Sequence, residues 1–143
     1  MTSSPKIGVV SCSGEGCAQG TVSRIATHIV LEKLRPENTV TICLPLFLAG
    51  EKEERMFAKS FPTIAVDGCK KKCAKNAIEK YSGKTASSIV VDDLLKEWGL
   101  AEPKSRRELD EEGLETASKV AEHIVAMMDD ISARGRLRRN ANV

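Results

Sequence analysis

Four short apolar runs alternate with segments of helical pattern along this chain, and this alternation limits the possible folds more than any other feature. The runs cover residues 7–11, 40–44, 63–66 and 88–91. Short continuous apolar runs are typical of strands buried on both faces, as strands are in parallel sheets. A chain in which strands and helices alternate forms a parallel sheet with right-handed crossovers. We therefore predict an α/β fold.

Apolar residues at helical spacing predict the helices that cover this sheet. Three helices are expected to have the apolar faces Val22, Ile25, Ala26 and Ile29; Ala74, Ala77, Ile78 and Tyr81; and Leu114, Ala117, Ala121, Ile124, Val125 and Met128. Thr21 is the expected cap of the first. Short helices are expected over the charged stretch 51–59 and from Asp92 or Asp93 to Trp98, before a polar connector at residues 99–107. The prediction is a single-domain, three-layer, Rossmann-like fold with a four-stranded parallel sheet flanked by helices.

The length and composition fit one globular domain. The chain has 143 residues, of which 41% are hydrophobic and 29% are charged. A chain of this size buries a core without needing disulfides. Only 3% of the residues are aromatic, so the core must be built from Val, Ile, Leu and Ala. We expect one domain over residues 1–143, with flexible ends at residues 1–5 and 135–143.

Charge and hydropathy argue against nucleic acid and membranes as partners. The net charge is only +2, and the arginines between residues 134 and 139 are typical of a solvated chain end. The longest apolar run, residues 42–50, contains Pro45 and is much shorter than the roughly 20 residues that cross a bilayer. No signal-peptide pattern opens the sequence. We therefore expect a cytoplasmic protein whose thiols stay reduced, and the sequence identifies no protein partner.

The five cysteines predict metal or redox chemistry rather than a disulfide framework, because their number is odd and no secretion signal is present. Cys12 follows the first predicted strand, Cys43 ends the second, and Cys69 follows the third. Cys73 comes one helical turn after Cys69. Carboxyl ends of neighbouring parallel strands lie about 4.8 Å apart at one edge, where such sheets bind ligands. Zinc takes four ligands, and thiolate is its commonest structural ligand. A cysteine zinc site is therefore predicted, with Cys43 or Cys17 as its fourth ligand.

Positive charge and glycine surround Cys69 and Cys73. Residues 70–72 are three lysines, and the predicted helix directs its free N–H groups toward both thiols. Both effects are expected to lower the thiol pKa values and favour the metal-binding thiolate. Glycines are expected to shape the loops, with a sharp turn at Gly68 and with Gly14 and Gly16 folding the first loop over the site.

These residues resemble the DGC-motif family of zinc-binding proteins. The matching elements are Cys12-Ser13-Gly14, Cys43-Leu44-Pro45, Asp67-Gly68-Cys69 with Cys73, Leu34-Arg35-Pro36 and Ser82-Gly83-Lys84, so that the resemblance covers about residues 6–98. The resemblance implies an α/β fold and a zinc site formed by Cys12, Cys43, Cys69 and Cys73. It implies no reaction, and it gives no role to Cys17.

Other interpretations of the same residues stay open. A free cysteine often packs as a small hydrophobic residue, which applies most to Cys43, and Cys17 also fits a plain loop thiol. Four thiolates also hold iron–sulfur clusters, so an electron carrier is an alternative. A third hypothesis is an enzyme whose zinc has three cysteine ligands and one open position, with Asp67 or Glu15 as the base. Asp67 is, however, more typical of a turn or a helix cap.

Overall fold

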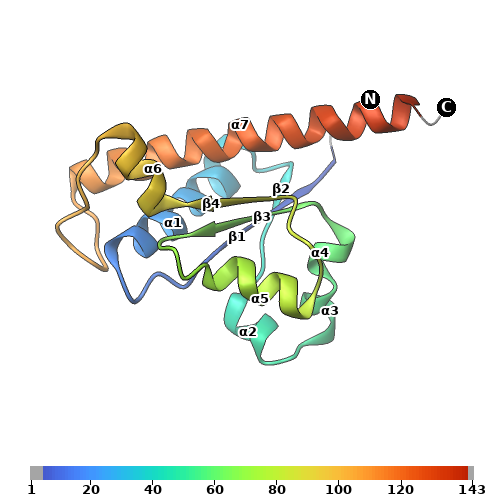
Figure 1. Cartoon of the computed structure of the whole chain (residues 1–143), viewed down its shortest axis with the longest axis horizontal. Coiled ribbons are helices and arrows are strands. Elements are labelled where there is room, and N and C mark those ends of the chain that lie inside the picture. The colour runs from blue at the N-terminus through green and yellow to red at the C-terminus, as the bar shows by residue number, and fades with distance from the viewer. Residues whose placement is uncertain (1–4, 142–143) are drawn as a thin grey trace.

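The computed structural model describes residues 5–141, and its four-stranded sheet is parallel throughout (Figure 1). The strands are β1 (Ile7–Ser11), β2 (Thr39–Val40), β3 (Thr63–Asp67) and β4 (Ser87–Val90). Their order in the sheet is β2-β1-β3-β4. The central strand β3 is buried along its whole length, as expected for a strand covered on both faces. The predicted α/β fold with a four-stranded parallel sheet flanked by helices is confirmed.

Helices cover both faces of this sheet. They are α1 (Ala18–Ile29), its π-helical continuation η1 (Val30–Leu34), α2 (Leu44–Leu48), α3 (Lys52–Arg55), α4 (Phe57–Ser60), α5 (Cys73–Tyr81), α6 (Val91–Trp98) and α7 (Glu111–Ala141). Because side chains alternate along a strand, Val9 packs with α1, α6 and α7, whereas Val10 packs with α2, α4 and α5. Figure 1 shows the three layers, with α7 above the sheet and α2 and α5 below it.

The long final helix packs against α1 through a buried stripe. Its members are Ala117, Val120, Ala121, Ile124 and Met128. Leu114, which we expected in this stripe, is 47% exposed instead. Residues 135–141 belong to α7, and the flexibility expected of the chain ends stays a prediction; residues 1–4 and 142–143 lie outside the described residues. Across residues 5–141, none of the helices combines the length and apolar character that a membrane span requires.

The predicted second strand, residues 40–44, is wrong beyond its first residue. β2 ends at Val40, and Leu44 already starts α2. A short apolar run fits either a strand or a helix. Here proline lies at the start of the helix, where its fixed backbone angle is favourable. Leu44 and Phe47, three residues apart, are both buried in the core between the sheet and α5, and a helix places them on the same face.

The predicted starts of two helices are also wrong. α1 begins at Ala18 with Cys17 as its N-cap, four residues before the expected cap Thr21. α6 begins at Val91, so that Asp92 lies in its first turn, where a negative charge is favourable. The charged stretch 51–59 forms two short helices, α3 and α4, instead of one. Trp98 packs as expected, with its ring edge-on to His123 at a centroid distance of 5.9 Å.

Candidate metal centre

The predicted cysteine edge coincides with the point where the strand order reverses. From β1 the chain passes to β2 on one side and then crosses to β3 on the other, so β1 and β3 are neighbours. Open α/β sheets bind ligands outside the strand ends at such a reversal. Cys12 follows β1 and Cys69 lies just beyond β3. The Cys12 amide donates to the Val66 carbonyl at 3.1 Å, so this loop leaves the sheet beside β3.

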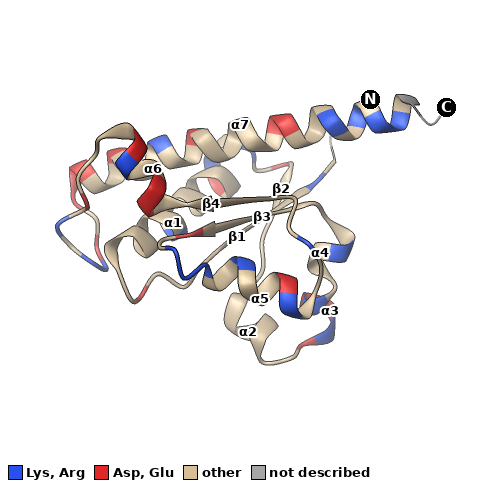
Figure 2. Cartoon of the chain, viewed as in Figure 1, with Lys and Arg blue, Asp and Glu red and all other residues tan. Residues whose placement is uncertain are grey.

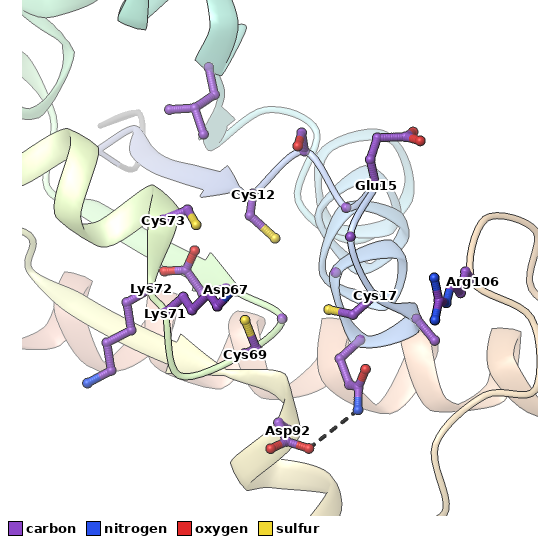
Figure 3. Close-up of a pocket in the computed structure, with 18 of the residues that line it drawn as sticks. Cys12, Glu15, Cys17, Asp67, Cys69, Lys71, Lys72, Cys73, Asp92 and Arg106 are labelled. Atoms are coloured by element: carbon purple, nitrogen blue, oxygen red, sulfur yellow. Dashed lines mark hydrogen bonds between the residues drawn. The ribbon is translucent and has the colours of Figure 1, made fainter.

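A cavity of about 880 Å³ lies at this edge and is lined by four of the five cysteines. They are Cys12 from the β1–α1 loop, Cys17 from the start of α1, Cys69 from the β3–α5 loop and Cys73 from the start of α5. Figure 3 shows their sulfur atoms pointing into the same space. Cys43 is exposed and is not among the residues that line the cavity, although its neighbours Leu44 and Pro45 are.

Three glycines allow the loops around the cavity to touch. A Cβ atom on Gly68 would lie 2.3 Å from the Gly20 nitrogen and 2.7 Å from the Gln19 carbonyl carbon. A Cβ atom on Gly20 would lie 2.8 Å from the Gly14 Cα atom. The backbone bends at Gly68 directly after β3, as predicted, and the missing side chain at this residue also allows the close approach of α1. Gly16 has open space around it, so its predicted role in folding the loop is not supported.

Asp67 caps α5 from the end of β3. Its two carboxylate oxygens accept hydrogen bonds from the amides of Ala74 at 2.7 Å and Lys75 at 3.1 Å. The N-cap residue Lys72 makes no side-chain cap bond, so Asp67 takes that function from a distance. Burial raises the pKa of Asp67, although both amides and the nearby lysines act to lower it. The predicted capping role is confirmed, and both oxygens are occupied by it.

The expected lowering of thiol pKa values is wrong for Cys73. Partial desolvation in the cavity raises the pKa of this thiol, and the negative charges of Asp67, Cys12 and Cys69 add to the effect. Lys71 opposes the shift without reversing it. The effect of the lysine run, visible in Figure 2 as the blue loop that leads into α5, is thus outweighed by desolvation together with the negative neighbours. The same interactions indicate that Cys73 lies near two other thiols.

A connector that we predicted only as polar covers one side of the cavity. Gln19 and Thr21, both buried in the first turns of α1, hold it in place. The Gln19 amide donates to Glu102 at 2.6 Å, and the Thr21 hydroxyl donates to the carbonyls of Gly14 and Arg106. The sequence pattern does not predict these hydrogen bonds, because the connector lies about 85 residues further along the chain.

The donor chemistry of the cavity suits a thiophilic metal. Zinc is bound by thiolates at about 2.3 Å in a tetrahedron. Within residues 5–141, no three His, Cys, Asp or Glu side chains are grouped closely enough to hold a metal ion without rearrangement. The Cys12 sulfur lies 3.3 Å from the Ser23 hydroxyl oxygen, and this hydrogen bond competes with metal binding by Cys12. The thiols suit zinc by their chemistry, and four of them point into one cavity (Figure 3).

Comparison with known families agrees with the motif. A family model described as the DGC domain matches residues 8–124, which is most of the chain and extends well beyond the segment that carries the resemblance. Comparisons with curated proteins and with solved structures gave no significant match. The match includes the strand ends, the Asp67-Gly68-Cys69 motif and the connector. The chain belongs to the DGC-domain family.

Proposed function

We propose that this protein binds one zinc ion through cysteine thiolates in the cavity at the carboxyl edge of its sheet, and that it acts in the cytosol. The observation that carries the proposal is the arrangement of four thiols around one cavity, two from the segment between β1 and α1 and two from the segment that runs from β3 into the start of α5. Soft thiolate ligands select zinc and other thiophilic metals over magnesium or calcium. Family membership and the five cysteines are compatible with a metal-binding role.

Three ligands of the proposed site are Cys12, Cys69 and Cys73. The fourth thiolate is Cys43 on the family resemblance, with Cys17 as the alternative. Bound zinc would stabilise the thiolate form of each ligand. The chain's own contribution is to position the thiols: Asp67 fixes the start of α5, and with it the backbone of Cys73. Lys71 and Lys72 line the cavity and would offset the negative charge that thiolates bring to it.

The contacts around the site favour an exchangeable zinc ion over a purely structural one. The two segments that supply the cavity thiols already touch where Gly68 meets Gly20. The Gly68 carbonyl also accepts a hydrogen bond from the Asp92 amide at 3.0 Å. A metal is therefore not needed to join these loops, in contrast to small zinc domains that unfold without it. The thiol of Cys73 is exposed within a wide cavity, so that another ligand can reach it.

Metal analysis of anaerobically purified protein tests the proposal. We expect about one zinc per chain in the wild type and strong loss of zinc in C69S and C73S. A colourless protein excludes the iron–sulfur alternative, because such clusters absorb visible light. Substantially less than one zinc per chain, unchanged by these substitutions, would refute the proposed function.

An enzyme with an open zinc position is a second candidate, and the cavity volume is the observation that favours it. A volume of about 880 Å³ is typical of small-molecule sites and far exceeds the space around one metal ion. The two bases considered for such an enzyme are engaged, however. Asp67 caps α5, and Glu15 pairs with Arg107 at 3.1 Å. The zinc-binding proposal therefore stands ahead of the enzyme.

A further inference from the structure

We infer that Cys17 is the fourth thiolate ligand of the metal in this protein, in place of Cys43. The inference rests on the proposed zinc site and identifies a ligand that the DGC motif does not include. Cys17 is the N-cap of α1, and its half-buried side chain lines the cavity opposite Cys73 (Figure 3).

Backbone contacts place Cys17 beside the other thiols. The Cys17 carbonyl accepts hydrogen bonds from the amides of Gly20 at 3.1 Å and Thr21 at 3.3 Å, which form the first turn of α1. Gly20 in turn touches Gly68, the residue directly before Cys69. One helical turn therefore separates Cys17 from the point where α1 meets the loop between β3 and α5, which contains Gly68 and Cys69 and is called the DGC loop below. This proximity is set by main-chain packing and does not depend on how any side chain is rotated.

The same turn of α1 lies beside Cys12. The Cys12 sulfur is 3.5 Å from the position that a Cβ atom on Gly20 would take. It is also 3.3 Å from the Ser23 hydroxyl oxygen, one turn further along the helix. The first turn of α1 is thus the shared neighbour of Cys12 and of the DGC loop. A thiol at the start of this helix is well placed to join them.

Cys43 is in a less favourable position. It follows β2 by three residues and caps α2, which is anchored by Phe47, a completely buried core residue. The cavity wall next to it is apolar and consists of Leu44, Pro45 and Leu48. The Cys43 thiol is exposed outside the cavity lining, whereas the Cys17 thiol already belongs to it.

The spacing of the cysteines supports the same choice. Zinc ligands commonly occur in pairs separated by about two to four residues, since one turn or loop then supplies two of the four ligands. Cys12 and Cys17 are separated by four residues, and Cys69 and Cys73 by three. Both pairs fit this pattern, whereas Cys43 has no cysteine nearby in the sequence. The structure brings the two pairs to one cavity.

Serine substitutions at Cys17 and Cys43 form a matched test. Both cysteines are N-caps that make no side-chain cap bond, and serine is a preferred residue at this position. Neither C17S nor C43S should therefore disturb its helix, which far-ultraviolet circular dichroism checks. C17A, as a second variant, removes the weak oxygen donor that serine retains.

Zinc affinity is measured by competition with a chelating indicator. The number of thiolate ligands is measured on the Co²⁺-loaded protein, from the intensity of its thiolate-to-cobalt charge-transfer absorption. Loss of an outer-shell partner alone costs about 10–100-fold in affinity, so we expect C17S and C17A to lose more than roughly 100-fold. The charge-transfer absorption should fall by about a quarter, because one of four thiolates is lost. C43S should match the wild type in both measurements.

Different failures are distinguishable. If C12S and C69S lose zinc while C17S keeps the wild-type affinity and absorption, the inference is wrong and the proposed site stands. If C43S loses as much as C17S, or more, Cys17 does not replace Cys43. If the wild type binds neither zinc nor Co²⁺ through thiolates, the proposed function fails and the inference with it.

Discussion

Replacing Gly68 with alanine tests how the site is assembled. The added methyl carbon would lie 2.3 Å from the Gly20 nitrogen, 2.5 Å from its Cα atom and 2.7 Å from the Gln19 carbonyl carbon. All three are main-chain atoms, so no side-chain rotation relieves the overlap. The DGC loop and the first turn of α1 must separate by about 1 Å in a tightly packed region. Overpacking of this kind should lower the free energy of unfolding by about 3 kcal/mol, which is the upper end of the usual range.

Urea unfolding followed by circular dichroism measures this cost. For a slope of about 2 kcal/mol per molar urea, the midpoint should fall by roughly 1.5 M. G16A is the control, since a Cβ atom there meets nothing within 4 Å. Its free energy of unfolding should stay within about 1 kcal/mol of the wild type. Equal midpoints for G68A, G16A and the wild type would refute the claim that contact between α1 and the DGC loop requires glycine.

Three further predictions concern the neighbours of this contact. D67A removes the acceptor of two α5 amides and should lower the free energy of unfolding by about 1–3 kcal/mol in thermal or urea unfolding; an unchanged value would show that the cap is dispensable. T21V removes the hydroxyl that holds the connector, so trypsin should cleave residues 99–107 faster than in the wild type while the global stability falls by about 1–2 kcal/mol. Wild-type cleavage rates would contradict this anchoring. A thiol is mostly protonated at neutral pH, and the raised pKa of Cys73 adds to this, so zinc must displace a proton and its apparent affinity should fall as pH falls. Calorimetry in buffers of different ionisation enthalpy should detect the released protons, and an affinity independent of pH would contradict the thiolate site.

The sheet and its cysteine edge were predictable because both follow from local patterns. The buried runs at β1 and β3 are short and largely apolar; Cys12 comes directly after β1, and Cys69 comes two residues after the end of β3. Parallel strands of an α/β sheet end at one edge, so their following residues meet there without further information. The capping function of Asp67 was predictable for a similar reason, since this residue type caps helices and precedes one here.

The remaining features depend on contacts between distant segments. The strand expected at residues 40–44 ends at Val40, and Leu44 starts α2, in which Phe47 is buried; no local pattern distinguishes these two structures. Cys17 seemed a plain loop thiol because its neighbours are set by the packing of Gly20 on Gly68. The raised pKa of Cys73 also depends on contacts between distant segments. The lysines adjacent to Cys73 are visible in the sequence, whereas its burial in the cavity and its proximity to Asp67 and Cys12 result from the fold.

The identity of the atoms that hold zinc at the sheet edge is the property to measure first. X-ray absorption at the zinc edge, on anaerobically purified wild-type protein, measures the ligand types and their distances directly. We predict four sulfur ligands at about 2.3 Å and a matching analytical content of about one zinc per chain. A first shell dominated by oxygen or nitrogen, or protein without bound zinc, would contradict the proposed site.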